Sequence, residues 1–528
     1  MRVPPSESMW LKRYGTRRMF RPRCQVTAIL HAEAKFVLGQ RFLPGTYVGR
    51  DLVNPVIQHL FEFYDRRLRD LAPLIASRDL VDFLLFQYDE ANNILHGKGI
   101  LDLNDRLDWQ RVEPLLRRAI KYIVELLCIE QRMGGPQISE DHALIATEIA
   151  LACAETAADL AEMSNRVHAM FPEDCSVVVH EDFNPEAITI AVTGKYSGYD
   201  QRFLDRIIRD RENRDRFVGP EPQFDVHTDR HAEYLNQGFS SFFGISYAEF
   251  IAGICAVING ARPAGKGHFP TLFIRRSELV RQLCKSGRPH NAIEAMLRGF
   301  TVMHPELMKE NRVLWNAKQQ SRAYRRGFFK FPHKTGDHLA FSNAMAQESM
   351  IHLVSGVCFQ KLPREWMFPE AGKALATLSN AAGDWFEEIV ARNLRSLGYE
   401  GGRVRGIIGK RRDSLVIPAE VGDLDFLGYH PVRREILLVE AKMTSTGLEA
   451  QFWRDDVQQF VWDKRSYAER FRRKLQWVQE HLETIRRLLA APPECEFNAR
   501  MFTLYPCIAS EFIDDFPCQS ITEFMLCQ

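Results

Sequence analysis

The chain has 528 residues, a formal net charge of +1, 45% hydrophobic residues and 26% charged residues. This length is too great for one hydrophobic core, so we expect about two to four domains. A net charge so close to zero excludes a uniformly cationic protein, so any nucleic acid must be bound by local basic patches. No apolar run reaches the length of a membrane span, and the 11 cysteines contain no Cys-x-x-Cys pair. These features predict a cytoplasmic protein with reduced thiols, no membrane partner and no zinc site.

Residues 1–170 are expected to form a mainly helical region behind a basic N-terminal arm. The arm, residues 1–24, is rich in arginine, and we interpret it as a surface segment. Four later stretches carry apolar residues at helical spacing with charges on the opposite face: 54–64, 80–88, 109–131 and 139–164. Each stretch predicts an amphipathic helix that packs against its neighbours.

Residues 171–370 are expected to form a mixed, mostly helical region, with short strands at 176–179 and 187–192. Residues 260–267 have the glycine and lysine spacing of a phosphate-binding loop. Ser246 and Glu249 form a capping box, however, which predicts a helix directly before that loop. A phosphate-binding loop needs a strand there, so we interpret 260–267 as a loop that ends a helix.

A basic stretch with interleaved aromatic residues, 311–334, contains no acid and allows two interpretations. Basic side chains such as Arg325 and Arg326 neutralise phosphates, and aromatic rings stack on unpaired bases, which predicts a nucleic-acid contact. The alternative is a solvated helix face with its aromatic residues in the core. The sequence does not decide between the two.

Residues 420–442 contain the acids and the lysine that indicate a function. Alternating apolar residues predict two strands, 421–428 and 435–442, joined by a turn. Alternate side chains of a strand share a face, so pairing of the strands brings Asp425 toward Glu440, and Lys442 shares the face of Glu440. Two carboxylates and one ammonium are therefore expected at the end of a buried sheet.

This set of groups has a chemical interpretation. Two nearby carboxylates repel each other unless a cation lies between them. Carboxylate oxygens suit Mg²⁺, with Mn²⁺ as the alternative, and a bound metal lowers the pKa of its water. Lys442 is then available to orient the attacking water and to stabilise developing negative charge.

Asp425, followed by Glu440-Ala441-Lys442 after an apolar strand, resembles the core motif of the PD-(D/E)XK nuclease superfamily, which includes restriction-type endonucleases and junction resolvases. The resemblance implies that Asp425, Glu440 and the Ala441 carbonyl bind the metal ion and that Lys442 positions the water. It also implies a further carboxylate on the helix before the hairpin.

Residues 383–399 predict that helix. Glu387 borders its apolar stripe and Glu388 lies on the wetter side, so we assign Glu387 to the site in preference to Glu388. After the hairpin, Gln458 and Trp462 resemble the Gln-x-x-x-Tyr element of one nuclease subgroup, with tryptophan in place of tyrosine. That element implies that Gln458 contacts nucleic acid.

The resemblance extends over residues 371–528 and implies a restriction-endonuclease-like core with the element order αβββαβ. Residues 500–505 and 521–526 predict its later strands. The expected fold class is therefore a multidomain α and α/β chain, in which a large mainly helical N-terminal region precedes this core.

Basic residues before the hairpin are expected to contact the substrate backbone: Arg403, Arg405, Lys410, Arg411 and Arg412. A further basic cluster, 464–474, is expected on the helix that follows. The sequence thus predicts a Mg²⁺-dependent nuclease that acts on DNA in preference to RNA. The helical region would be its recognition or regulatory module, as in bacterial antiviral defence. The alternative is a catalytically silent nuclease-like fold in a nucleic-acid-binding or assembly protein, and homo-oligomer formation stays open.

Overall fold

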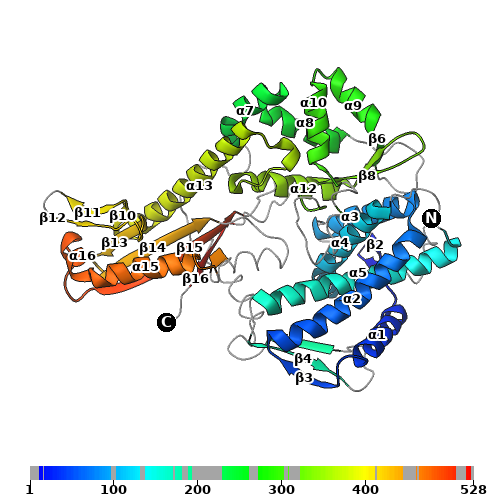
Figure 1. Ribbon diagram of the computed structural model, residues 1–528, viewed down its shortest axis with the longest axis horizontal. Helices are drawn as coiled ribbons and strands as arrows, with labels where there is room; N and C mark the ends of the chain where they lie inside the picture. Colours follow the sequence, from blue (N-terminus) through cyan, green and yellow to red (C-terminus); the bar gives the residue numbers. More distant parts are fainter. Residues whose placement is uncertain are drawn as a thin grey trace. The chain divides into compact units, whose positions relative to one another are not determined.

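Two compact units make up the chain in the computed structural model (Figure 1). The first contains Met1–Tyr199, Asn236–Val354 and Leu362–Phe368, and the second contains Asp200–Leu235, Ser355–Lys361 and Pro369–Gln528. Both sides of the predicted division at residue 170 belong to the first unit. The structure describes residues 11–15, 17–96, 101, 103–130, 137–169, 173–180, 188–192, 229–260, 272–302, 307, 322–410, 413–443, 459–460, 463–506 and 519–524.

Long helices form most of the first unit, and α2 to α5 lie where the apolar periodicity predicts helices. They are α1 (Cys24–Gly39), α2 (Arg50–Ile75), α3 (Arg78–His96), α4 (Leu103–Glu130) and α5 (Glu140–Ala169). Their apolar stripes, which include Leu60, Leu84 and Leu127, meet in one core. Strands β1 (Leu11–Tyr14) and β2 (Arg17–Phe20) form a hairpin, and β3 (Gly45–Val48), β4 (Cys175–Val179) and β5 (Ile188–Val192) form a small sheet. The two strands predicted near residues 176–192 are thereby confirmed.

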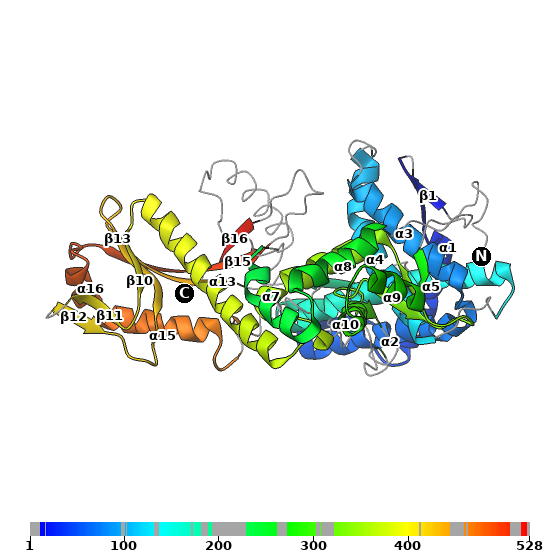
Figure 2. The ribbon, with the colours of Figure 1, turned by 90° about the horizontal axis from the view of Figure 1, so that it is seen from above.

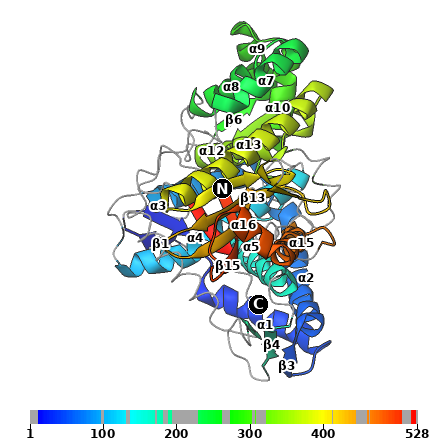
Figure 3. The same cartoon turned by 90° about the vertical axis from the view of Figure 1, so that its left-hand side faces the viewer.

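A second group of elements in this unit surrounds a four-stranded sheet. The sheet has the order β6 (Leu272–Arg275), β9 (His338–Phe341), β8 (Phe328–Phe331) and β7 (Thr301–Val302). Helices α8 (Tyr247–Gly260), α9 (Arg276–Lys285) and α10 (His290–Gly299) lie together (Figures 1 and 3). Helix α7 (Asp229–Phe243), which belongs to this unit from Asn236 onward, precedes them, and α12 (Asn343–Ser355) follows β9. No single helix among the described residues is long and apolar enough to cross a bilayer; α7 and α8 meet that measure only as a pair bent by 84°.

The predicted capping box is present at the start of α8. The Ser246 hydroxyl accepts a hydrogen bond from the Glu249 N–H at 3.2 Å, and the Glu249 carboxylate accepts one from the Ser246 N–H at 2.8 Å. A helix therefore precedes the glycine-rich loop, where a phosphate-binding loop requires a strand. Residues 261–267 of that loop lie outside the described residues.

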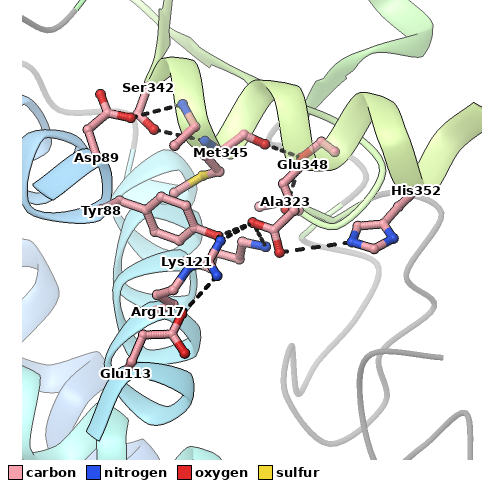
Figure 4. Close-up of polar contacts among 12 residues, drawn as sticks. Tyr88, Asp89, Glu113, Arg117, Lys121, Ala323, Ser342, Met345, Glu348 and His352 are labelled. Atoms are coloured by element: carbon pink, nitrogen blue, oxygen red, sulfur yellow. Dashed lines mark hydrogen bonds and ion pairs between the residues drawn. The ribbon is translucent and has the colours of Figure 1, made fainter. Parts of the chain in front are cut away.

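A polar network joins α12 to α3 and α4 inside the first unit (Figure 4). The carboxylate of Glu348 accepts a hydrogen bond from Arg117 at 2.7 Å and one from the Tyr88 hydroxyl, and it lies 3.4 Å from the Lys121 ammonium. Arg117 also binds Glu113 at 2.8 Å. Burial alone would raise the pKa of Glu348, but Lys121 and Arg117 outweigh it and hold that pKa well below its usual value. Glu348 is therefore the anion on which two buried cations depend.

The second unit is built around a five-stranded mixed sheet with the order β10 (Glu400–Val404), β13 (Leu424–His430), β14 (Glu435–Met443), β15 (Glu496–Pro506) and β16 (Gln519–Phe524). Strands β10, β13 and β14 are antiparallel neighbours, whereas β15 is parallel to β14. A parallel connection needs a crossover, and α15 (Tyr467–Glu480) and α16 (Leu482–Leu488) lie in it. The order from helix to final parallel strand is thus α13, β10, β13, β14, α15, β15, with a β11 (Ile407–Lys410) and β12 (Asp413–Val416) hairpin inserted after β10.

Helices cover both faces of this sheet (Figures 1 and 2). Helix α13 (Pro369–Ser396) packs Phe386 and Val390 against one face. Helix α15 packs Phe471 and Trp477 against the other. The predicted helix 383–399 is the C-terminal half of α13, and Gly398 follows its end with a φ of 96°, as expected for a helix C-cap.

We predict that Glu348→Gln lowers the free energy of unfolding of the first unit by about 3 kcal/mol, because it leaves Arg117 and Lys121 buried without their shared anion. Urea unfolding followed by circular dichroism measures this. Glu278→Gln is the matched control in the same unit, since Glu278 is exposed and pairs with the exposed Arg281 on its own helix; its expected cost is about 1 kcal/mol or less. Equal effects of the two changes would contradict the structural role of Glu348.

Candidate active site at the end of the mixed sheet

The predicted hairpin is present as β13 and β14. Its register pairs Phe426 with Val439 and Leu427 with Leu438, and residues 431–434 form the turn. Continued by one residue, this register sets Asp425 beside Glu440 at the end of β13. Both strands are buried on both faces, and the continuous apolar run 436–439 of β14 suits such a position.

Three oxygens converge on the ammonium of Lys442. Its Nζ lies 2.7 Å from Glu440 Oε1, 3.2 Å from Asp425 Oδ2 and 3.1 Å from the carbonyl oxygen of Ala441. The Ala441 N–H also donates a hydrogen bond to Asp425 Oδ2 at 2.8 Å. Asp425 is 5% exposed and Glu440 3% exposed, so the structure brings the predicted acids and lysine together at a buried point.

Attraction between opposite charges stabilises the cluster of Asp425, Glu440 and Lys442. Burial alone would lower the pKa of Lys442, but the neighbouring carboxylates of Glu440 and Asp425 outweigh it and raise the Lys442 pKa above its ordinary value. Lys442 therefore remains a cation at neutral pH. It supplies the positive charge that two adjacent buried carboxylates require.

A second lysine reaches the same glutamate, and sequence reasoning missed its role. Lys474 on α15 lies with its Nζ 2.6 Å from Glu440 Oε2 and is 7% exposed. The sequence placed Lys474 in a basic cluster, but its spacing carried a signal. It falls on the apolar stripe of α15 with Phe471, Trp477 and Val478. A lysine on a buried helix face indicates a buried anion nearby.

Glu387 on α13 lies at the edge of this group. Its side chain is 15% exposed, and Arg403 on β10 approaches its Oε2 to 2.9 Å. Burial is the main cause that raises the pKa of Glu387 to about 7, and the negative charge of Asp425 is the second. The positive charges of Arg403 and Lys442 oppose this rise. Glu388 instead points to solvent and pairs with Arg395 at 3.3 Å. The structure therefore places Glu387, and not Glu388, on the side of Asp425.

The oxygens at the sheet end form an incomplete set of metal ligands. Within the described part of the chain, no three Asp, Glu, His or Cys side chains form a group that could hold one. The set at the sheet end is smaller: one oxygen each from Asp425, Glu440 and the Ala441 carbonyl, all directed at a single cation. Hard oxygens from two carboxylates suit Mg²⁺, which keeps several of its waters. The donor set thus fits a partly hydrated cation, and it does not fit a complete protein cage.

The arginines predicted to contact nucleic acid near the hairpin are paired with acids. Arg403 binds Asp384 as well as Glu387, and Arg405 lies 3.3 Å from Asp384 and 3.8 Å from Asp423. Strand β11 ends at Lys410, whose side chain is not described, and Arg411, Arg412 and Gln458 lie outside the described residues.

The structure changes the interpretation of the basic aromatic stretch where it is described, from residue 322. Phe328, Phe329 and Phe331 form strand β8, not a helix face, and all three are buried. Arg326 is also buried, and donates hydrogen bonds to the Thr301 carbonyl at 3.0 Å and to Glu365. The predicted phosphate contact by Arg326 is therefore corrected to a structural role. Arg325 is half-buried, and this burial lowers its pKa to about 10, so it stays charged.

No protein-family model, no curated protein and no solved structure matches this chain.

We predict that Glu387→Gln gains stability over the parent chain as pH rises from about 4.5 to about 7. The carboxyl of Glu387 has a higher pKa in the folded state than in the unfolded state. Between these two pKa values the unfolded chain releases the proton more readily than the folded one, so the parent loses stability as the pH rises through this window. The gain should reach roughly 2–3 kcal/mol at pH 8. Unfolding in chelator at several pH values measures it.

Glu388→Gln is the matched control for this series, because Glu388 is the exposed neighbour on the same helix. Its stability difference from the parent should change little over the same pH range. Parallel pH profiles for the two variants would mean that Glu387 ionises as an ordinary carboxylate.

Proposed function

We propose that this chain is a metal-dependent nuclease of the PD-(D/E)XK type, which hydrolyses phosphodiester bonds in DNA. The observation that carries the proposal is the convergence of Asp425, Glu440 and the Ala441 carbonyl on one cationic point at the buried end of the sheet. The element order α13, β10, β13, β14, α15, β15, with β15 parallel to β14, supports the restriction-endonuclease-like core that the motif implies.

Each residue then has a role. Asp425, Glu440 and the Ala441 carbonyl would hold Mg²⁺, or Mn²⁺ as the alternative. When bound, the ion lowers the pKa of a water molecule and neutralises charge on the phosphate. Lys442, whose side chain is 21% exposed, is the group that can turn toward the substrate, orient the water and stabilise the developing negative charge. Glu387, with a pKa of about 7, is suited to take up or release a proton on its carboxylate near neutral pH.

The first unit is proposed as the recognition or regulatory module of this nuclease. It is large and mostly helical, and its buried charged network gives it a specific internal packing. The link to bacterial antiviral defence is an analogy of architecture and rests on no site residue. A homo-oligomer would let two such sites cut the two strands of a duplex.

A catalytically silent nucleic-acid-binding protein is the second candidate, and one observation favours it. Both carboxylates at the sheet end already have lysine partners, and the nearby acid Glu387 is held by Arg403. A group of acids neutralised from within has less need of a metal ion. This candidate predicts salt-sensitive nucleic-acid binding and no cleavage with any divalent metal.

We predict that the purified chain cuts DNA with Mg²⁺ and stops when EDTA is added. Lys442→Ala should lower the cleavage rate by about 10²–10³-fold, because it removes a preorganised charge at the reacting phosphate. A fluorescent duplex and a single-stranded oligonucleotide measure the rate on each form of DNA, and an RNA oligonucleotide tests the preference for DNA. Lys373→Ala, which removes an exposed lysine of the same unit that lies outside the predicted basic clusters, is the control and should keep the parent rate.

Cleavage that persists in folded Lys442→Ala would contradict the proposed role of the lysine. The silent candidate is tested with Glu440→Gln, which keeps the size of the side chain. Nucleic-acid binding that is equal in Glu440→Gln and the parent, with no cleavage by either, would favour that candidate over the nuclease.

A further inference from the structure

Glu440 lies between two lysines, one on each carboxylate oxygen. Lys442 contacts Oε1 at 2.7 Å, and Lys474 contacts Oε2 at 2.6 Å. The first lysine comes from the same strand and the second from α15, 34 residues along the chain. Together with Asp425, the site holds two carboxylates and two ammonium groups, so the charges balance and the two lysines can have different roles.

The two lysines differ in what they touch. Lys442 contacts all three oxygens of the candidate metal set, whereas Lys474 contacts only Oε2 of Glu440, which is not part of that set. A divalent cation bound to the set would take the oxygens that Lys442 now holds, because two cations cannot share them at contact distance. The Lys474 contact does not compete with a cation at Oε1.

The two lysines also differ in freedom to move. The Lys442 side chain is 21% exposed and lies over the edge of the site beside the Tyr467 ring, 5.8 Å from its centre. The Lys474 side chain is 9% exposed and belongs to the apolar stripe of α15, which packs on the sheet. Withdrawing Lys474 from Glu440 would leave an ammonium buried among apolar side chains, which is strongly unfavourable. Lys474 is therefore the more constrained of the two cations, and Lys442 is the one with access to solvent.

We propose that Lys474 is a positioning residue for the metal ligand Glu440. By holding Oε2, it keeps the carboxylate in one rotamer with Oε1 directed at Asp425 and the Ala441 carbonyl after Lys442 has moved away. This inference rests on the proposed nuclease function, since it assumes that a metal ion uses these oxygens. Groups that orient a metal ligand from behind typically contribute about 10–100-fold to metal affinity.

A purely structural salt bridge is the competing explanation, and it predicts a different result. In that case Lys474 would stabilise the packing of α15 without altering metal binding by the folded protein. A simple repulsion between Lys474 and the metal predicts the opposite sign, that is, tighter metal binding when Lys474 is removed.

Titration calorimetry of the full chain with Mn²⁺ separates these outcomes. We expect Lys474→Met, which keeps an unbranched side chain one atom shorter and removes the ammonium, to weaken Mn²⁺ binding by about 10–100-fold. Lys474→Gln retains a hydrogen-bond donor and should lose less. Arg473→Met is the matched control, because it removes a positive charge from the adjacent, exposed position of the same helix, and it should stay within about twofold of the parent.

The Mg²⁺ dependence of DNA cleavage is a second test of the role of Lys474. For Lys474→Gln, the Mg²⁺ concentration for half-maximal cleavage should rise, while the rate at saturating Mg²⁺ falls by a smaller factor than the affinity. A structural role alone would lower the melting temperature and leave this midpoint unchanged.

Unchanged or tighter Mn²⁺ binding in folded Lys474→Met overturns the inference, and if that variant does not fold, Lys474→Gln decides by the same criterion. Asp425→Asn separates this failure from failure of the nuclease proposal. If Asp425→Asn loses Mn²⁺ binding and the Lys474 variants do not, only the role of Lys474 is rejected. If Asp425→Asn binds Mn²⁺ like the parent, or the parent binds none, the metal site itself is rejected together with this inference.

Discussion

Two carboxylates buried side by side are the constraint on which the second unit depends. Asp425 and Glu440 are each almost inaccessible, and two carboxylates so close together repel each other unless positive charge lies in contact with them. Lys442 bridges them, and Lys474 completes the partner set of Glu440. The end of the sheet is therefore held by charge, whereas its middle is held by apolar packing.

This arrangement ties together elements that are distant in the chain. The Glu440–Lys474 contact fixes α15 on one face of the sheet. On the other side, Arg403 of edge strand β10 binds Asp384 and Glu387 of α13, so that the strand and the helix share an ion pair next to the site. Positions that would carry the chemistry are thus also positions that hold the layers together, and a change at any of them will alter stability as well as activity.

The parts of the site that were predictable are those set by local pattern. Alternation gave the β13–β14 hairpin and the convergence of Asp425, Glu440 and Lys442, and helical spacing separated Glu387 from Glu388. Strands β10 to β12 were not predicted, because arginines and glycines interrupt the alternation of apolar and polar residues in this part of the sequence. The contact of Lys474 with Glu440 was not predicted, because it joins a strand to a helix across a crossover connection. The periodicity of a local segment carries no information about such a pair. Arg326 was assigned to nucleic-acid binding because a sequence does not reveal whether an arginine pairs with an acid of its own chain, here the half-buried Glu365.

The ion pairs of Arg403 and Arg405 with acidic side chains reduce the positive charge that this edge of the sheet offers to a nucleic acid. Salt dependence of nucleic-acid binding arises when protein cations replace the small ions condensed on the phosphates. Guanidinium groups that already hold Asp384, Glu387 and Asp423 have little net charge to offer in that exchange. A strand approaching this edge of the sheet would therefore displace few counterions, and its affinity would vary only weakly with ionic strength unless other basic groups of the chain take part.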